Sequence, residues 1–333
     1  MDPVTQGVLG ATLPQATVKK SHIVYAGILG LLGGMAPDLD VLIRSPNDPL
    51  LFLEFHRQFT HSLFFIPIGG LICALVLHSL LGKRWQLTFK QTWVYCTLGY
   101  ATHALLDACT TYGTQLLWPL TNARYAWNTI AVIDPLYTVP LLILIGLGFK
   151  KRNPWFARVA LIWALVYPTL GLLQRDRAVD AGLVLAAERG HTTIKLEAKP
   201  SFANILVWKT VYETETHYFV DAVRTGVDIK VYPGESVEKL DLARDFPWLD
   251  ANSQQAEDVE RFRWFSNGYL ATDPHNENSI IDIRYSIVPN EVKALWRIRL
   301  DPQGDLEQHV EYVAKREVSE DSHEIFWGML FGE

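Results

Sequence analysis

His103 and Asp107 lie four residues apart within Cys96–Trp118, an apolar stretch that is typical of a membrane helix. Residues at this spacing share one face of an α-helix, so the imidazole and the carboxylate point the same way. An ionisable pair inside a membrane helix is energetically costly and usually marks a functional site. The alternative is a buried His–Asp hydrogen bond that only packs the helices.

Further residues with metal-binding side chains occur at the ends of neighbouring apolar runs. Asp38 and Asp40 follow Pro37, which interrupts a helix and lets both carboxylates turn toward one centre. His56 and His61 are five residues apart, a poor spacing for one helical face, so we expect one of them to come from a loop. The candidate ligands are Asp38, Asp40, His56, His61, His103 and Asp107, with Asp134 as a possible addition.

Carboxylates and imidazoles without thiolates favour a hard or borderline divalent ion. Zinc is the first candidate, manganese, iron and magnesium are alternatives, and the number of ligands leaves room for more than one ion. The chemistry expected of such a site is attack by a metal-activated water on a carbonyl or phosphoryl centre. Asp38 or Asp40 would act as the general base. Thr110, Thr111 and Tyr112 either orient the ligands or hydrogen-bond the backbone of their own helix.

The chain of 333 residues divides into two halves of opposite charge. Residues 1–177 contain 14 Lys and Arg against 8 Asp and Glu, a formal charge of +6, and long apolar runs. Residues 178–333 contain 16 basic and 28 acidic residues, a formal charge of −12, and short alternating patterns. This predicts a helical membrane domain over 1–177 and an acidic water-soluble domain over 178–333.

The membrane half is predicted to be polytopic and all-helical. A first stretch, Val4–Thr17, is too short to span a bilayer comfortably because a helix rises about 1.5 Å per residue. The predicted spans are His22–Met35, Ser62–Leu81, Trp93–Tyr112, Ile130–Phe149 and Trp155–Leu173.

If the spans alternate in direction, most Lys and Arg residues of the short loops fall on one side of the membrane. The positive-inside rule makes that side cytoplasmic, which places the C-terminal domain outside the cytoplasm. The same alternation brings the candidate ligands to one level, near the outer face. This convergence favours a shared site over isolated buried pairs.

The second half is predicted to form an α+β domain with an antiparallel sheet. A helix is expected over Ala178–Arg189 and another over Phe246–Phe265. Strands are expected at Thr193–Glu197, Ile205–Tyr212, His217–Val223, Val227–Tyr232, Ser279–Val288 and Lys293–Leu300. All three cysteines lie in the apolar half, which excludes a disulfide framework in the second half. No basic patch interleaved with aromatic residues points to nucleic acid.

Four motifs occur in an order that resembles the YdjM-type family of inner-membrane metal-dependent hydrolases, some members of which are regulated by the LexA repressor. The motifs are Asp2-Pro3-x-Thr5, Ala36-Pro37-Asp38-Leu39-Asp40, His56-Arg57-x-x-Thr60-His61-Ser62, and His103-x-x-x-Asp107 with Tyr112-Gly113. The resemblance covers the first half of the chain. It implies a hydrolase with an unassigned substrate, whose matching positions are Asp38, Asp40, His56, His61, His103 and Asp107.

One position departs from the resemblance. Many relatives have His after the Asp-Pro-x-Thr run, where this chain has Gln6, a weak ligand whose presence puts one ion of a cluster in doubt. Asp2 could join the site only if residues 2–35 form a helical hairpin. The Thr-His-Ser and His-x-x-x-Asp elements are also similar, more distantly, to those of zinc-dependent phospholipase C, an all-helical protein.

The sequence therefore favours a multi-pass bacterial inner-membrane hydrolase acting on a lipid ester, a phosphodiester or another lipid-linked substrate. The alternatives are a non-catalytic metal-binding or transport protein and a membrane anchor for the soluble domain. A transporter should have polar groups at several depths, whereas the inner halves of the predicted spans are almost wholly apolar.

Overall fold

A computed structural model describes residues 1–314 and 320–333 of the chain. These residues divide into two compact units. The first comprises Met1–Ile43, Phe55–Leu172 and Phe202–Asn204, and the second comprises Arg44–Glu54, Leu173–Ser201 and Ile205–Glu333. A domain boundary is predicted after residue 177, but the helix Pro154–Glu188 continues through that position without a break.

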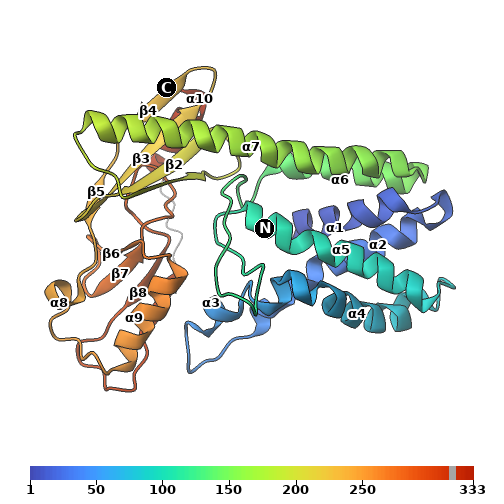
Figure 1. Ribbon diagram of the computed structural model, residues 1–333, viewed down its shortest axis with the longest axis horizontal. Helices are drawn as coiled ribbons and strands as arrows, with labels where there is room; N and C mark the ends of the chain where they lie inside the picture. Colours follow the sequence, from blue (N-terminus) through green and yellow to red (C-terminus); the bar gives the residue numbers. More distant parts are fainter. Residues whose placement is uncertain (315–319) are drawn as a thin grey trace. The chain divides into compact units, whose positions relative to one another are not determined.

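The first unit is helical, and its longer helices lie alongside one another (Figure 1). They are α1 (Pro3–Thr17), α2 (Ile23–Met35), α4 (Ile66–Leu77), α5 (Phe89–Cys109), α6 (Pro135–Lys151) and the first part of α7 (Pro154–Glu188). Short 3-10 turns are η1 (Lys20–His22), η2 (Ala36–Leu42), η3 (Phe59–His61) and η4 (Leu63–Phe65), and a π-helical turn, η5 (His78–Gly82), extends α4.

The helices that carry the polar residues begin at residues whose side chains cap the backbone. The Asp2 side chain accepts a hydrogen bond from the Thr5 N–H at the start of α1, and Pro3 occupies the first turn. Thr88 and Gln91 form a capping box at the start of α5. Pro37 lies in the first turn of η2, where the chain changes from α-helical to 3-10 geometry.

Helices α1, α2 and α5 approach one another at glycines. A Cβ on Gly30 would lie 2.5 Å from the Gly10 oxygen, and a Cβ on Gly99 would lie 2.1 Å from the Gly30 oxygen. A Cβ on Gly34 would lie 2.8 Å from the Gln6 oxygen. No methyl group fits at these distances, so the glycines permit direct contact between helix backbones. Because residues 6 and 10 face residues 34 and 30, α1 and α2 form an antiparallel hairpin.

Within the described residues, three helical stretches are long and apolar enough to cross a membrane: Lys20–Leu42, Leu63–Gly82 and Pro154–Glu188. They correspond to three of the five predicted spans. The other two coincide with helices that lack the required length or apolar character, because α5 carries Lys90, His103 and Asp107 and α6 has 17 residues.

The segment Arg44–Glu54 belongs to the second unit although it lies between two parts of the first. Leu50 and Leu53 of this segment are buried with residues of the C-terminal half, among them Phe262 and Leu300. The short helix α3 (Leu51–Phe55) ends as the chain returns to the first unit. The prolines and charges of this stretch predict only a polar connector, whereas its apolar run, Leu50–Leu53, is the signal for packing.

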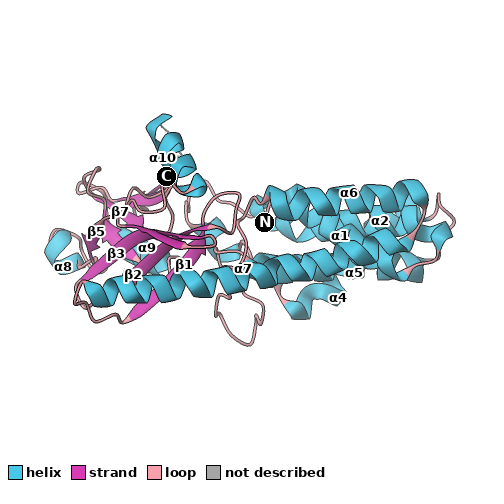
Figure 2. Cartoon of the chain, turned by 90° about the horizontal axis from the view of Figure 1, so that it is seen from above, coloured by secondary structure: helices cyan, strands magenta, loops and turns pink. Residues whose placement is uncertain are grey.

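The second unit is α+β, as predicted, but it contains two antiparallel sheets (Figure 2). The first sheet has the order β1 (Lys195–Pro200), β2 (Val207–Glu213), β3 (His217–Thr225) and β4 (Ile229–Tyr232), with β5 (Ser236–Glu238) also pairing with β3. The second has the order β6 (Leu270–Thr272), β7 (Ser279–Asp282), β8 (Trp296–Arg299) and β9 (Glu311–Ala314). The helices are the last part of α7, α8 (Leu242–Asp245), α9 (Gln254–Phe265) and α10 (Glu320–Phe331).

The predicted helix Phe246–Phe265 is wrong in its first part. The long helix α9 begins at Gln254 because the Ser253 side chain caps it, accepting a hydrogen bond from the Ala256 N–H. The predicted strand Ser279–Val288 is also too long, since β7 ends at Asp282. Both boundaries depend on local side-chain caps and turns that interrupt an apolar pattern.

Candidate metal centre

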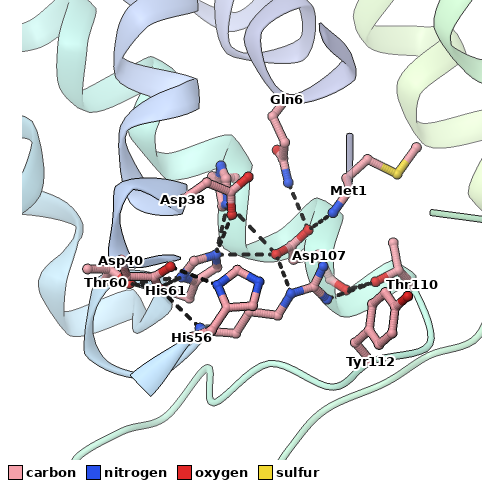
Figure 3. A network of polar contacts seen from close by, with 12 residues as sticks. Met1, Gln6, Asp38, Asp40, His56, Thr60, His61, Asp107, Thr110 and Tyr112 are labelled. Atoms are coloured by element: carbon pink, nitrogen blue, oxygen red, sulfur yellow. Dashed lines mark hydrogen bonds and ion pairs between the residues drawn. The ribbon is translucent and has the colours of Figure 1, made fainter. Parts of the chain in front are cut away.

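Six of the predicted ligand residues come together in the first unit (Figure 3). Two overlapping groups offer ligand atoms within 4.8 Å of one another. One group contains Asp38, His61, His103 and Asp107, and the other contains Asp38, Asp40 and His56. Asp38 belongs to both groups.

Two imidazoles face each other at the centre of the first group. His61 Nε2 lies 2.9 Å from His103 Nε2. The other ring nitrogen of His103, Nδ1, lies 2.6 Å from the carbonyl oxygen of Gly34. A carbonyl can only accept a hydrogen bond, so Nδ1 carries the proton and the neutral imidazole has its lone pair on Nε2. The close approach of α2 to α5 thus sets the tautomer of His103.

Two carboxylates surround this pair of nitrogens. An Asp38 oxygen lies 3.2 Å from His103 Nε2 and 3.5 Å from His61 Nε2. Asp107 Oδ2 lies 3.2 Å from His61 Nε2 and 3.8 Å from His103 Nε2. His61, His103 and Asp107 are fully buried, whereas the Asp38 side chain is 22% exposed. The first group is therefore reached by solvent on the side of Asp38.

Asp40 contacts a histidine of each ligand group and two further residues of the site. Its Oδ1 lies 2.7 Å from His56 Nδ1, and its Oδ2 accepts hydrogen bonds from the Thr60 hydroxyl (2.6 Å) and the Arg57 N–H (3.1 Å). Oδ2 also lies 3.2 Å from His61 Nδ1. A carboxylate on the far nitrogen of an imidazole fixes the ring orientation and increases its basicity as a ligand.

His56 and His61 both lie outside long helices, as their spacing predicts. His56 follows α3, and His61 ends the 3-10 turn η3. Burial lowers the pKa of His56, which favours the neutral imidazole that binds a metal.

The donor set fits a divalent cation. With Nδ1 of His103 protonated, its Nε2 lone pair faces His61 Nε2 and two carboxylates across distances of 2.9–3.8 Å. Asp107 Oδ2 is buried without a hydrogen-bond donor of good geometry. The Met1 amino group and the Arg57 guanidinium lie beside Asp107 and offset its charge. The Asp38 carboxylate and the lone pair of His103 Nε2 face the same buried region, where a bound cation would offset their mutual repulsion. Nitrogen and oxygen donors without sulfur are suited to zinc, manganese or iron.

Arg57 is the principal site residue that the sequence analysis did not recognise. It is 4% exposed, its Nε lies 3.0 Å from Asp107 Oδ2, and its Nη1 donates to the Thr110 hydroxyl at 3.1 Å. Its guanidinium lies 5.2 Å from the centre of the Tyr112 ring. A φ of 67° turns the chain at Arg57, between the two histidines. The available signal was an arginine placed between two candidate ligands.

Thr110 and Tyr112 therefore contact the Arg57 side chain and help to hold it beside the site. The Thr110 hydroxyl accepts from Arg57 and donates to the Asp107 carbonyl oxygen at 2.7 Å. It combines the two roles that the sequence left open, an orienting contact and a hydrogen bond to its own backbone.

Of the three additional candidates, only Gln6 contacts a predicted ligand residue, whereas Asp2 and Asp134 cap helices. Gln6 reaches the site, because its Nε2 donates to Asp107 Oδ1 at 2.8 Å. The α-amino group of Met1 lies 2.5 Å from the same oxygen. Among the described residues, neither ligand group includes Asp2 or Asp134. Asp2 caps α1, and Asp134 caps α6 and accepts a hydrogen bond from the Tyr167 hydroxyl at 3.0 Å.

Thr60→Val is expected to weaken metal binding about tenfold, because it removes the hydroxyl that connects Asp40 and His61 while preserving the shape of the side chain. Calorimetric titration with Mn²⁺ or Zn²⁺ measures the effect. Thr60→Ser keeps the hydroxyl and should bind like the parent. Equal affinities for the Val and Ser variants would contradict an orienting role for Thr60.

The apolar helices of the first unit define a membrane protein. Residues 1–178 match the model of the family described as YdjM inner membrane protein, which is more than half of the chain. The chain therefore belongs to this family, and the predicted family is confirmed.

The chain is also similar to "Inner membrane protein YbcI" of Escherichia coli (strain K12), with 33% identity over 116 residues. This similarity covers 33% of the chain and 62% of the relative, so the chain spans less than two thirds of that protein. No solved structure matches the chain.

Proposed function

We propose that this protein is a membrane-bound metal-dependent hydrolase that acts on a lipid ester, a phosphodiester or another lipid-linked substrate. The observation that carries the proposal is the convergence of His61 Nε2, His103 Nε2 and two carboxylates on one point of the helical unit. A divalent ion bound there would supply Lewis-acid activation of the substrate and of a water.

Asp38 is the best candidate for the general base. It is the most exposed member of the first group, and it belongs to both groups, so it can face a substrate while remaining next to the ligands. Asp40 has its oxygens occupied by His56, Thr60, Arg57 and His61. We therefore assign Asp40 to orienting the histidines, and Asp38 to accepting a proton from the attacking water.

His61, His103 and Asp107 would hold the first ion. A second ion would be held by His56 and by Asp40, which would bind it in addition to orienting His61. Asp38, a member of both groups, would keep an oxygen for the attacking water. Zinc, manganese, iron and magnesium all remain compatible with oxygen and imidazole donors. Gln6 occupies the position where many relatives have histidine, and in this chain it donates to Asp107 instead of offering a ring nitrogen.

A lipid substrate is favoured by the position of the ligands in a unit built from apolar helices. Large apolar side chains are exposed on these helices, for example Leu75 (57%), Leu142 (41%) and Leu165 (72%). Such surfaces are stable against lipid. The distribution of Lys and Arg favours an orientation with the second unit outside the cytoplasm.

The test combines metal content with activity. We expect the detergent-purified protein to retain close to one or two ions per chain, and the His103→Ala/Asp107→Asn variant to lose them while remaining folded. The loaded parent should then hydrolyse a lipid ester or phosphodiester, and chelation should abolish the activity. His78→Ala is a matched control, since His78 belongs to neither ligand group and its Nδ1 lies 3.0 Å from the Thr92 hydroxyl.

The outcomes separate the candidate functions. Bound metal without hydrolysis of any lipid class would favour a metal-binding or transport protein. No metal in the parent after loading with zinc and manganese would overturn the hydrolase proposal and favour a membrane anchor for the second unit.

A further inference from the structure

The two ligands Asp40 and His56 are joined by a segment that packs elsewhere. The chain leaves the first unit after Ile43, contributes Arg44–Glu54 to the second unit and returns at Phe55. Only Phe55 separates the last residue of this segment, Glu54, from His56. The position of the segment therefore limits where His56 can lie.

Apolar side chains anchor the segment in the second unit. Leu50 is 1% exposed and Leu53 is 6% exposed, and both belong to a core cluster with Phe262 and Ile280. The Phe52 ring lies 5.2 Å from the Tyr312 ring in an edge-to-face arrangement. Burying side chains of this size away from water stabilises the packing of the segment against this core.

Arg261 of α9 forms ion pairs with Asp48 in the middle of the segment and with Glu54 at its end. Its Nη1 and Nη2 lie 3.0 and 2.8 Å from the two oxygens of Asp48, and its Nε lies 2.5 Å from Glu54. Nη1 also donates to the fully buried Asp258 at 2.8 Å. Asp258 holds the guanidinium in place, and the planar fork of arginine makes the bidentate contact to Asp48 directional.

We propose that Arg261 is a positioning residue for the candidate metal centre: by fixing Arg44–Glu54, it sets the position of His56 relative to Asp40. The effect on metal binding rests on the proposed function, whereas the effect on the backbone of residues 55–62 does not.

Hydrogen exchange of the full-length protein in detergent, followed by mass spectrometry, tests the positional effect without metal. In Arg261→Ala, we expect peptides covering residues 44–54 and 55–62 to exchange about fivefold faster or more. The second peptide contains the Arg57 amide, which donates to Asp40 in the folded protein. Arg263→Ala is the matched control on α9, because Arg263 pairs with Glu260 at the surface.

A gentler variant covers the case in which Arg261→Ala does not fold. Asp48→Asn with Glu54→Gln removes the charges that Arg261 binds and keeps the volume of both side chains. Faster exchange in residues 44–54 with unchanged exchange in residues 55–62 would overturn the proposal. Unchanged exchange in both peptides would do so as well.

Titration with Mn²⁺ gives the second readout. Where the parent binds two ions, the Arg261 variants should weaken one of them about tenfold and leave the other unchanged, because only one group includes His56. General destabilisation would weaken both ions, and that result would contradict the proposal. A parent that binds no ion would reject the proposed function, while the exchange experiment would still decide the role of Arg261.

Discussion

His61→Ala is expected to lower the affinity for a divalent ion by about 100-fold or more, the largest effect of any single substitution at the site. His61 Nε2 faces His103 and Asp107, and His61 Nδ1 faces Asp40 and Thr60. Removing the imidazole therefore deletes a ligand and also removes a contact of Asp40. Loss of a residue that only orients a ligand already lowers metal affinity by about 10- to 100-fold. Calorimetric titration of the detergent-solubilised protein with Zn²⁺ or Mn²⁺ measures the loss.

His56→Ala is the informative comparison. It removes a side chain that is 30% exposed and belongs only to the group with Asp38 and Asp40. We expect it to weaken one ion and to leave the ion at His103 and Asp107 in place. If His61→Ala binds as tightly as the parent, His61 is a packing residue and the proposed centre is wrong.

Gly99→Ala is expected to destabilise the first unit by about 3 kcal/mol, because its new methyl group would lie 2.1 Å from the Gly30 oxygen. Separating α2 from α5 would also move His103 away from the Gly34 carbonyl that fixes its tautomer. The thermal midpoint in detergent should fall by roughly 6–12 °C, and less protein should accumulate in the membrane fraction.

Gly146→Ala is the matched control for this change. Gly146 lies in α6, and a Cβ there would have nothing within 4 Å. Alanine at that position should leave the thermal midpoint unchanged or raise it slightly, since alanine favours a helix over glycine by up to about 1 kcal/mol. Equal midpoints for the two variants would show that α2 and α5 can adjust to a methyl group.

The spacing of the candidate ligands predicted that they converge, and the structure places six of them within two overlapping groups. Asp38 and Asp40 could be recognised because Pro37 interrupts the helix before them, and His103 and Asp107 because they share a helical face. These signals are local, so they can be read from short stretches of sequence.

The residues that orient the ligands could not be predicted in the same way. Arg57 counts as an ordinary loop charge until the fold places it 3.0 Å from Asp107, fifty residues further along the chain. Gln6 was named as a possible site residue only through the family resemblance, and its contact with Asp107 accompanies the hairpin of α1 and α2. Long-range packing creates these contacts, and the pattern of apolar residues carries no information about the partner.

The same limit applies to Arg44–Glu54. Its prolines and charges are typical of a surface connector, and the apolar run Leu50–Leu53 shows that it packs against something. The core that receives it is built mainly from residues 246–310. The packing of this segment in the second unit is therefore visible in the fold and hidden in the linear order.

The linear order also has a consequence for biosynthesis. Asp48 and Arg261 are 213 residues apart, so at 5–20 residues per second the ribosome adds Arg261 roughly 10–40 s after Asp48. During that time the membrane helices can insert, whereas Leu50 and Leu53 cannot yet be buried because the residues of their core have not been synthesised. On the proposed role of Arg261, the segment Arg44–Glu54 and the neighbouring His56 take their final positions only after residue 261 has been made, so the site is completed late in synthesis.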